Sequence, residues 1–171
     1  GLDSNGNLYI SGGEIYVFGP TDNGNGALDY NGEASITGGV CVALGMNGMA
    51  QNFGNNSTQG SMLVNLNSIQ NAGTNISLLD SIGKELISFV ATKQFNSVVI
   101  STPEIKINET YTLQYGSNSQ EITMSSLIYG SGSGMGGGMK GGMPDGKGKP
   151  GNMPDNPENM KLKGEKPGNM P

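Results

Sequence analysis

The sequence of 171 residues contains no histidine, no arginine, no tryptophan and a single cysteine, Cys41. Without histidine, the chain lacks the side chain that most often serves as a general base or activates a nucleophile. One cysteine cannot form an internal disulfide, and the position of Cys41 inside an apolar run predicts a small buried hydrophobe. No apolar run approaches the roughly 20 residues that a membrane-spanning helix needs. We therefore expect neither a usual catalytic apparatus nor a membrane span.

Acidic residues outnumber basic ones in the first part of the chain. The net charge is −5, and residues 1–60 hold five acidic residues and no lysine. An acidic surface repels the phosphates of DNA and RNA, so nucleic acid is excluded as an expected partner.

A sequence repeat dominates the first part of the chain. The stretch "LDSNGNLYISGGEIYVFGP" at 2–20 returns as "LDYNGEASITGGVCVALGM" at 28–46, an offset of 26 residues. Short β-prone runs bounded by glycine and asparagine, repeated at this period, favour successive turns of a parallel β-helix. Equivalent side chains would then stack, and a β-meander of duplicated hairpins is the competing interpretation. The expected inward ladders are Leu8 over Ala34, Ile10 over Ile36, Ile15 over Cys41 and Val17 over Ala43.

Three segments follow from the change in pattern along the chain. Residues 1–60 are predicted to be C-terminal turns of a β-helix, and since Gly1 falls within a repeat, we expect further turns before it. Residues 61–130 contain six strand-like runs without the repeat, which predict a small antiparallel β-sandwich-like cap. Within them, "LLDSIGKELISF" predicts a hairpin whose turn residues include Asp80. Residues 131–171 are rich in glycine, proline and methionine, which predicts a disordered low-complexity tail.

Side-chain oxygens concentrate in "DSNGN", "DNGN" and "DYNGE", near the start of each repeat and between the repeats. Calcium binds six to eight oxygen ligands, and acids and amides at alternate turn positions are suitable donors. In the stacked arrangement Asp3 would lie over Asp29, and two carboxylates about 5 Å apart repel each other. A bound cation would relieve this repulsion, and so would solvent. Asparagine and aspartate also occur in turns for conformational reasons alone.

Tyr9, Tyr16 and Tyr30 fall at positions that face outward if their aliphatic neighbours face inward. Outward aromatic rings can stack on the apolar C–H faces of sugars. Alternatively, they pack beneath a neighbouring loop.

The motifs "GLDSNGNLYISGG", "GPTDNGNGALDYNGEASITGG", "ISLLDSIGKELISF" and "FNSVVISTPEI", in this order, resemble a secreted bacterial carbohydrate-binding family of the clostridial cellulose- and pectin-binding type. The resemblance covers residues 1 to about 116. It implies a right-handed parallel β-helix, similar to that of pectate lyases, with bound calcium and no established catalytic residues. The calcium ligands that it suggests are Asp3, Asn5, Asp22, Asn25 and Asp29.

We therefore expect an extracellular or cell-surface protein that binds a plant-type polysaccharide without cleaving it and is stabilised by Ca²⁺. The alternative is a structural surface or matrix protein that self-associates into fibres through stacked β-helix ends. A degenerate lyase or glycosidase is the third hypothesis, although stacked carboxylates form a ladder rather than a catalytic cleft.

Overall fold

The computed structural model describes residues 1–130, which form strands and a single 3₁₀ turn, and the predicted tail 131–171 lies outside the described residues. The expected all-β class is confirmed. Within the described residues, no helix is long and apolar enough to cross a membrane. The elements are β1 (Leu2–Ser4), β2 (Leu8–Ile10), β3 (Glu14–Phe18), β4 (Leu28–Tyr30), β5 (Ala34–Ile36), β6 (Val40–Gly45), η1 (Asn47–Met49), β7 (Ser61–Gln70), β8 (Asn75–Leu79), β9 (Glu85–Val90), β10 (Phe95–Ser101), β11 (Thr110–Tyr115), β12 (Asn118–Thr123) and β13 (Ile128–Tyr129).

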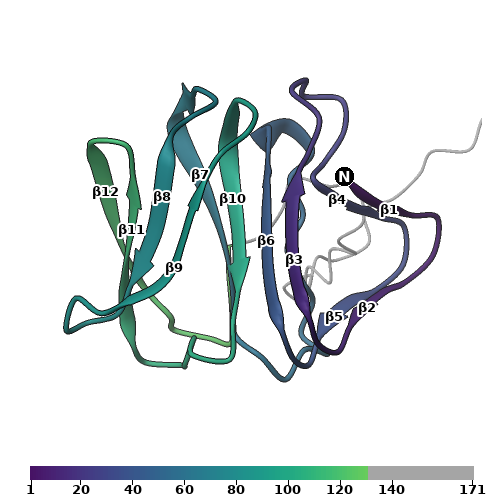
Figure 1. Ribbon diagram of the computed structural model, residues 1–171. Coiled ribbons are helices and arrows are strands. Elements are labelled where there is room, and N and C mark those ends of the chain that lie inside the picture. The colour runs from purple at the N-terminus through teal and green to yellow at the C-terminus, as the bar shows by residue number, and fades with distance from the viewer. Residues whose placement is uncertain (131–171) are drawn as a thin grey trace, which may run out of the picture. The chain divides into compact units, whose positions relative to one another are not determined.

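The two copies of the repeat stack on each other as two layers, which together we call the coil. The first copy, β1 to β3, is named the upper layer, and the second copy, β4 to β6, is named the lower layer; these names follow the order of the chain and not the position in Figure 1. Each strand pairs in parallel with its equivalent one layer on, as Ile10 with Ile36 and Ile15 with Cys41. The predicted vertical stacking is confirmed, and the β-meander is wrong because its pairs would be antiparallel. Two of the three pairs are separate two-stranded sheets, whereas β3 and β6 belong to a larger sheet.

The predicted inward ladders line the interior of the coil. Ile10, Ala34, Ile36, Cys41 and Ala43 are buried in one apolar cluster. The remaining ladder residues, Leu8, Ile15 and Val17, pack against this cluster and are half-buried.

Glycine permits the tight stacking of the coil at the corner before β3 and β6. Gly13 and Gly39 adopt φ of 84° and 88°, which other residues rarely adopt. A Cβ on Gly39 would lie 2.5 Å from the carbonyl oxygen of Gly13, whereas a Cβ on Gly13 would meet nothing within 4 Å. The lower layer therefore requires glycine for space as well as for backbone conformation.

A five-stranded sheet in the order β13-β7-β10-β6-β3 is the common wall of the protein (Figure 1). One of its faces closes the coil, and the other faces the four-stranded antiparallel sheet β12-β11-β8-β9. Successive residues of β6 alternate between these two cores, since Cys41 and Ala43 point into the coil while Val42 and Leu44 contact the second sheet. The predicted segments 1–60 and 61–130 thus share one sheet, joined by the antiparallel pairing of β6 with β10.

The hairpin between β8 and β9 has the predicted turn chemistry. Asp80 Oδ1 accepts hydrogen bonds from the backbone N–H groups of Ile82 and Lys84, at 3.1 and 2.8 Å. Gly83 has a φ of 81°, and β8 and β9 pair in antiparallel fashion. Local sequence was sufficient here because the turn is stabilised by its own side chain.

Candidate functional site

The three tyrosines expected to bind carbohydrate lie in three different sheets. Tyr9 on β2 is 63% exposed, and its hydroxyl accepts a hydrogen bond of 2.7 Å from Asn7 Nδ2. Tyr16 lies on β3 of the five-stranded sheet and is 44% exposed. Tyr30 lies on β4 and is only partly exposed. The structure therefore does not bring these residues together as one surface.

Tyr30 packs beneath the segment that follows the coil. Its hydroxyl donates to the carbonyl oxygen of Asn52, and its backbone N–H and C=O both bond to the side-chain amide of Gln51, at 3.0 and 3.3 Å. Burial raises the pKa of the Tyr30 phenol. Tyr30 thus follows the second interpretation given above, in which the ring is covered by a loop.

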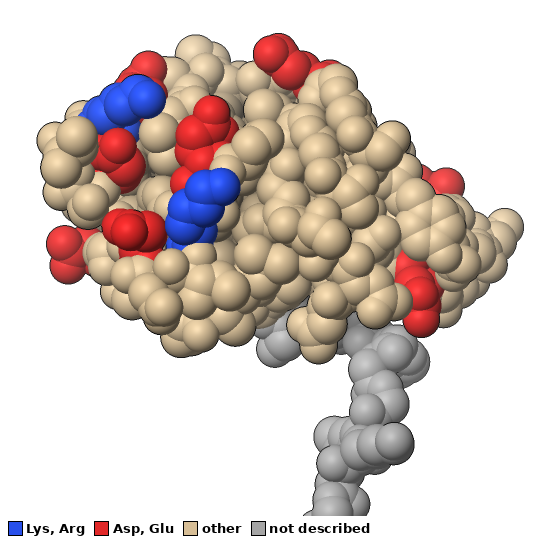
Figure 2. Space-filling model, turned by 90° about the horizontal axis from the view of Figure 1, so that it is seen from below, with Lys and Arg blue, Asp and Glu red and all other residues tan. Residues whose placement is uncertain are grey.

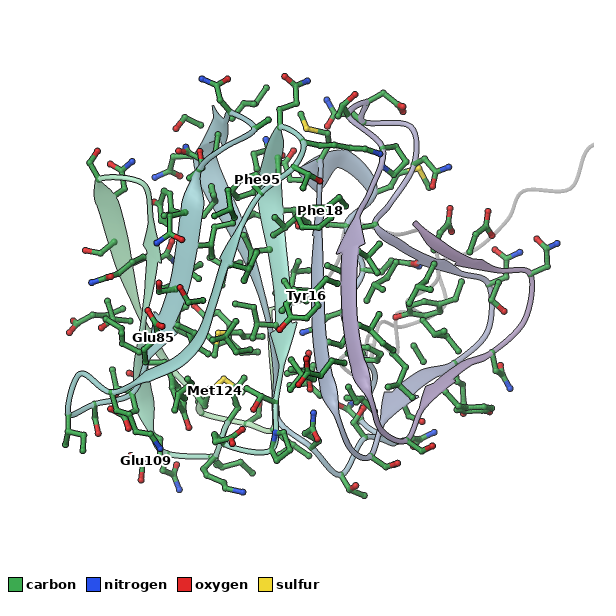
Figure 3. All side chains as sticks on the ribbon, viewed as in Figure 1. Tyr16, Phe18, Glu85, Phe95, Glu109 and Met124 are labelled. Atoms are coloured by element: carbon green, nitrogen blue, oxygen red, sulfur yellow. The ribbon has the colours of Figure 1, made fainter. Side chains whose placement is uncertain are left out.

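Tyr16, which is exposed, forms an aromatic pair with a half-buried phenylalanine that the sequence alone did not indicate. Its ring centroid lies 6.0 Å from that of Phe89 on β9, with an angle of 59° between the ring planes. These strands are the edges of the two facing sheets, and Figure 3 shows the Tyr16 ring beside β3, on the side of β9. We call Tyr16 and Phe89 the aromatic patch.

Phe89 could not be recognised from its own strand. It lies two residues after the buried Ile87 and therefore on the same face of β9, so the pattern of β9 places Phe89 on the core side. Phe89 is only half-buried because β9 is an edge strand, and an edge position is set by the order of strands in the sheet.

The segment between β9 and β10 is fastened to the end of β3 beside the patch. Lys93 Nζ donates to the carbonyl oxygens of Phe18 and Gly19, at 3.2 and 3.5 Å. Gln94 Nε2 donates to the carbonyl oxygen of Thr21 at 3.5 Å. These contacts hold the segment that follows β9 to the end of β3, so the two strands that carry the aromatic rings are tied together.

Of the expected calcium ligands, the structure brings Asp3 and Asp29 together as register partners in β1 and β4. Asn5 lies in the turn between β1 and β2, while Asp22 and Asn25 lie in the loop between β3 and β4. Asp22 Oδ1 accepts a 2.9 Å hydrogen bond from the Gly24 N–H, which is a turn contact. In the part of the chain that the structure describes, no group of three or more His, Cys, Asp or Glu side chains is arranged to hold a metal.

Other asparagines connect the layers of the coil. Asn7 Oδ1 accepts a 2.9 Å hydrogen bond from the N–H of Glu33 in the lower layer. The carboxylate of Glu33 in turn accepts a 2.9 Å bond from Asn56 Nδ2. These amide side chains therefore serve turns and corners.

Cys41 is fully buried in the coil, as predicted, and burial raises the pKa of its thiol to about 12. A thiol that stays protonated is a poor nucleophile and a poor metal ligand. Cys41 is thus a core residue.

Comparisons of the chain with protein-family models, with curated proteins and with solved structures gave no significant match. The family resemblance described above stays a prediction.

Proposed function

We propose that the protein binds extracellular polysaccharide without cleaving it, and that the aromatic patch is its contact surface. The observation that carries this proposal is the exposure of Tyr16 beside Phe89 at the open side of two facing sheets. Aromatic rings contribute large apolar contact area with few rotatable bonds, and a sugar ring presents an apolar face to match them.

The charge distribution supports a neutral or weakly charged ligand. On the face seen in Figure 2, the charged side chains gather toward one side, and much of the surface carries none. A polysaccharide offers hydroxyl groups and C–H faces, so its binding does not need a strongly charged surface.

We further propose that the coil is part of a right-handed parallel β-helix, in which the upper layer pairs on one side only among the described residues. Leu2 and Ser4 of β1 bond to the lower layer, so the backbone groups of Asp3 between them point away from it. The same alternation applies to Tyr9 in β2. Burial agrees with this one-sided pairing, because Leu2 and Leu8 are half-buried whereas their partners Leu28 and Ala34 are buried.

The lower edge, by contrast, is closed by the segment 51–59. Gln51 bonds to the backbone of Tyr30, Gly54 donates to the carbonyl oxygen of Ala34 at 2.8 Å, and Ser57 Oγ accepts from the Ile36 N–H at 3.1 Å. A fibre made by stacking identical ends requires both ends to be open. The closed lower edge therefore disfavours the fibre-forming alternative.

Retention on insoluble cellulose tests the proposed function, and a pectate gel serves as the strongly charged comparison that we expect to bind less well. We expect the full chain to be retained, and the variant carrying Tyr16→Ala and Phe89→Leu to lose at least about tenfold in affinity, because the exposed Tyr16 ring and the half-buried Phe89 ring are both removed. The matched control is Ile82→Ala, which removes a side chain that is 87% exposed in the β8–β9 turn. Equal retention of all three proteins, or of none, would contradict the proposal.

Calcium is tested separately, through the Asp3–Asp29 pair. Two carboxylates on neighbouring parallel strands repel by about 1 kcal/mol in a water-like dielectric. If calcium binds there, it raises the melting temperature of the native chain, and Asp29→Asn abolishes that rise. If solvent alone screens the pair, Asp29→Asn leaves the stability unchanged or raises it, whether or not calcium is present.

A further inference from the structure

A pocket of about 420 Å³ lies among the described residues, and neither residue of the aromatic patch lines it. Its size falls within the range of roughly 300–1,000 Å³ that is typical of small-molecule sites. The wall is built from the coil corner at Gly38, the segment before β7, the loop after β10, and Leu127. The lining residues are Thr37, Gly38, Thr58, Gln59, Gly60, Pro103, Ile105, Lys106, Ile107 and Leu127.

Gln59 places a fixed hydrogen-bond acceptor in this wall. The side chain is only 6% exposed, and its Nε2 donates to the carbonyl oxygen of Gly39 at 2.9 Å and to Ser101 Oγ at 2.8 Å. Ser101 Oγ donates onward to the carbonyl oxygen of Gly60 at 2.7 Å. Because a backbone carbonyl can only accept, the amide orientation of Gln59 is determined.

The other polar atom of that amide, Gln59 Oε1, accepts no hydrogen bond from any described residue. It is not sealed in the interior, since no fully buried side-chain nitrogen or oxygen among these residues lacks a partner. An acceptor on a side chain that is more than nine-tenths buried, and that lines a pocket, requires a donor from a ligand or from water. A ligand for this pocket should therefore carry an N–H or O–H group.

The loop after β10 supplies a cation and apolar surface. It is ordered by Tyr111, whose hydroxyl accepts from the Lys106 N–H at 2.7 Å and donates to the Glu104 carbonyl oxygen at 2.9 Å. Ile105 packs against Gly60, where an added Cβ would lie 2.5 Å from the isoleucine side chain. Lys106 is exposed, and none of the lining residues is acidic.

We propose that this pocket binds the C-terminal residue of a peptide with an aliphatic side chain, with its carboxylate at Lys106, its amide N–H on Gln59 Oε1 and its side chain against Ile105, Ile107 and Leu127. The absence of an aromatic ring from the lining disfavours a sugar. A single lysine without arginine disfavours a phosphate, which needs several donors. This inference uses no residue of the aromatic patch and is independent of the proposed function.

Four small probes separate the three contacts. N-acetyl-leucine is titrated into the full chain while the backbone amides of Thr58, Gly60 and Lys106 are followed by NMR. N-acetyl-leucine amide lacks the carboxylate and should bind about threefold to fivefold more weakly, since the lysine is exposed. N-acetyl-glycine lacks the side chain and should bind at least about tenfold more weakly. N-acetyl-N-methyl-leucine lacks the donor and should also bind more weakly, because Gln59 Oε1 stays unpaired.

The matched variants are Lys106→Glu and Lys84→Glu, which make the same charge change on two exposed lysines, only one of which lines the pocket. We expect Lys106→Glu to weaken N-acetyl-leucine by about tenfold or more and Lys84→Glu to leave it unchanged. Acetyl-Gly-Gly-Leu should bind at least as well as N-acetyl-leucine if the ligand is a chain terminus. Equal binding by both variants, equal binding of N-acetyl-glycine, or shifts confined to other residues would overturn the proposal.

Discussion

The stacking of the coil can be measured by adding one methyl group at equivalent positions of its two layers. Gly12 and Gly38 occupy the same place in the repeat, and neither has a positive φ. A Cβ on Gly12 meets no atom within 4 Å, whereas a Cβ on Gly38 would lie 2.7 Å from the carbonyl oxygen of Ser11 in the upper layer. The substitutions Gly12→Ala and Gly38→Ala therefore differ only in the presence of a layer above.

The expected magnitudes follow from these distances. Gly12→Ala should stabilise slightly, by up to about 1 kcal/mol, because alanine restricts the unfolded chain. Gly38→Ala should destabilise by roughly 1–3 kcal/mol, because a backbone carbonyl cannot move aside without shifting a strand end. The next pair adds the cost of a left-handed backbone, so Gly13→Ala should cost about 1–2 kcal/mol and Gly39→Ala roughly 2–5 kcal/mol.

Urea denaturation followed by circular dichroism gives the free energy of unfolding of the four variants, and thermal melts provide a second reading at roughly 4 °C per kcal/mol. The informative quantity is the difference in unfolding free energy between the two variants of each pair, because the effects of the glycine-to-alanine change and of the backbone conformation are the same for both and cancel. If Gly38→Ala and Gly12→Ala change stability equally, and Gly39→Ala and Gly13→Ala do so as well, the two repeats do not stack at this corner and the description of the coil is refuted.

Three further predictions concern single side chains. The pKa of the Cys41 thiol is raised from 9.0 to about 12, so it contributes stability that is fully present below pH 9 and is lost as the pH rises toward 12. Cys41→Ala should therefore flatten the plot of unfolding free energy against pH over this range, and an unchanged slope would contradict the burial of the thiol. The Thr102 hydroxyl lowers the pKa of the Glu104 carboxyl, so Thr102→Ala should return that pKa toward its usual value in an NMR titration, while Thr110→Ala, the control, should not. Gln51→Ala should cost about 1–3 kcal/mol and speed hydrogen exchange of the Tyr30 amide, because both backbone bonds of Tyr30 to that side chain are lost; retained protection would show that another group closes the lower edge of the coil.

The sequence by itself determined the layering of the coil. If short strands repeated at a constant offset stack in parallel, equivalent residues pair, so the pairing of Ile10 with Ile36 followed from counting residues. It also determined the burial of Cys41 and the turn at Asp80, because each depends on neighbours within a few positions along the chain.

Only the tertiary structure decided what packs against the outer face of β3 and β6, the coil strands that belong to the five-stranded sheet. The sequence pattern predicted residues 1–60 and 61–130 as separate segments, yet β6 of the first pairs with β10 of the second. Because of this pairing, β3 and β6 also contribute side chains to the core between the two larger sheets. Tyr16 accordingly meets Phe89, and Tyr30 is covered by the segment after the coil.

The pocket at Gln59 was likewise invisible in the sequence. Its wall joins the coil corner, the segment before β7 and the loop after β10, and Gln59 is fixed by Ser101, which lies 42 positions further along the chain. Local propensity cannot report contacts between segments so far apart, because they form only when the strands have taken their order in the sheet.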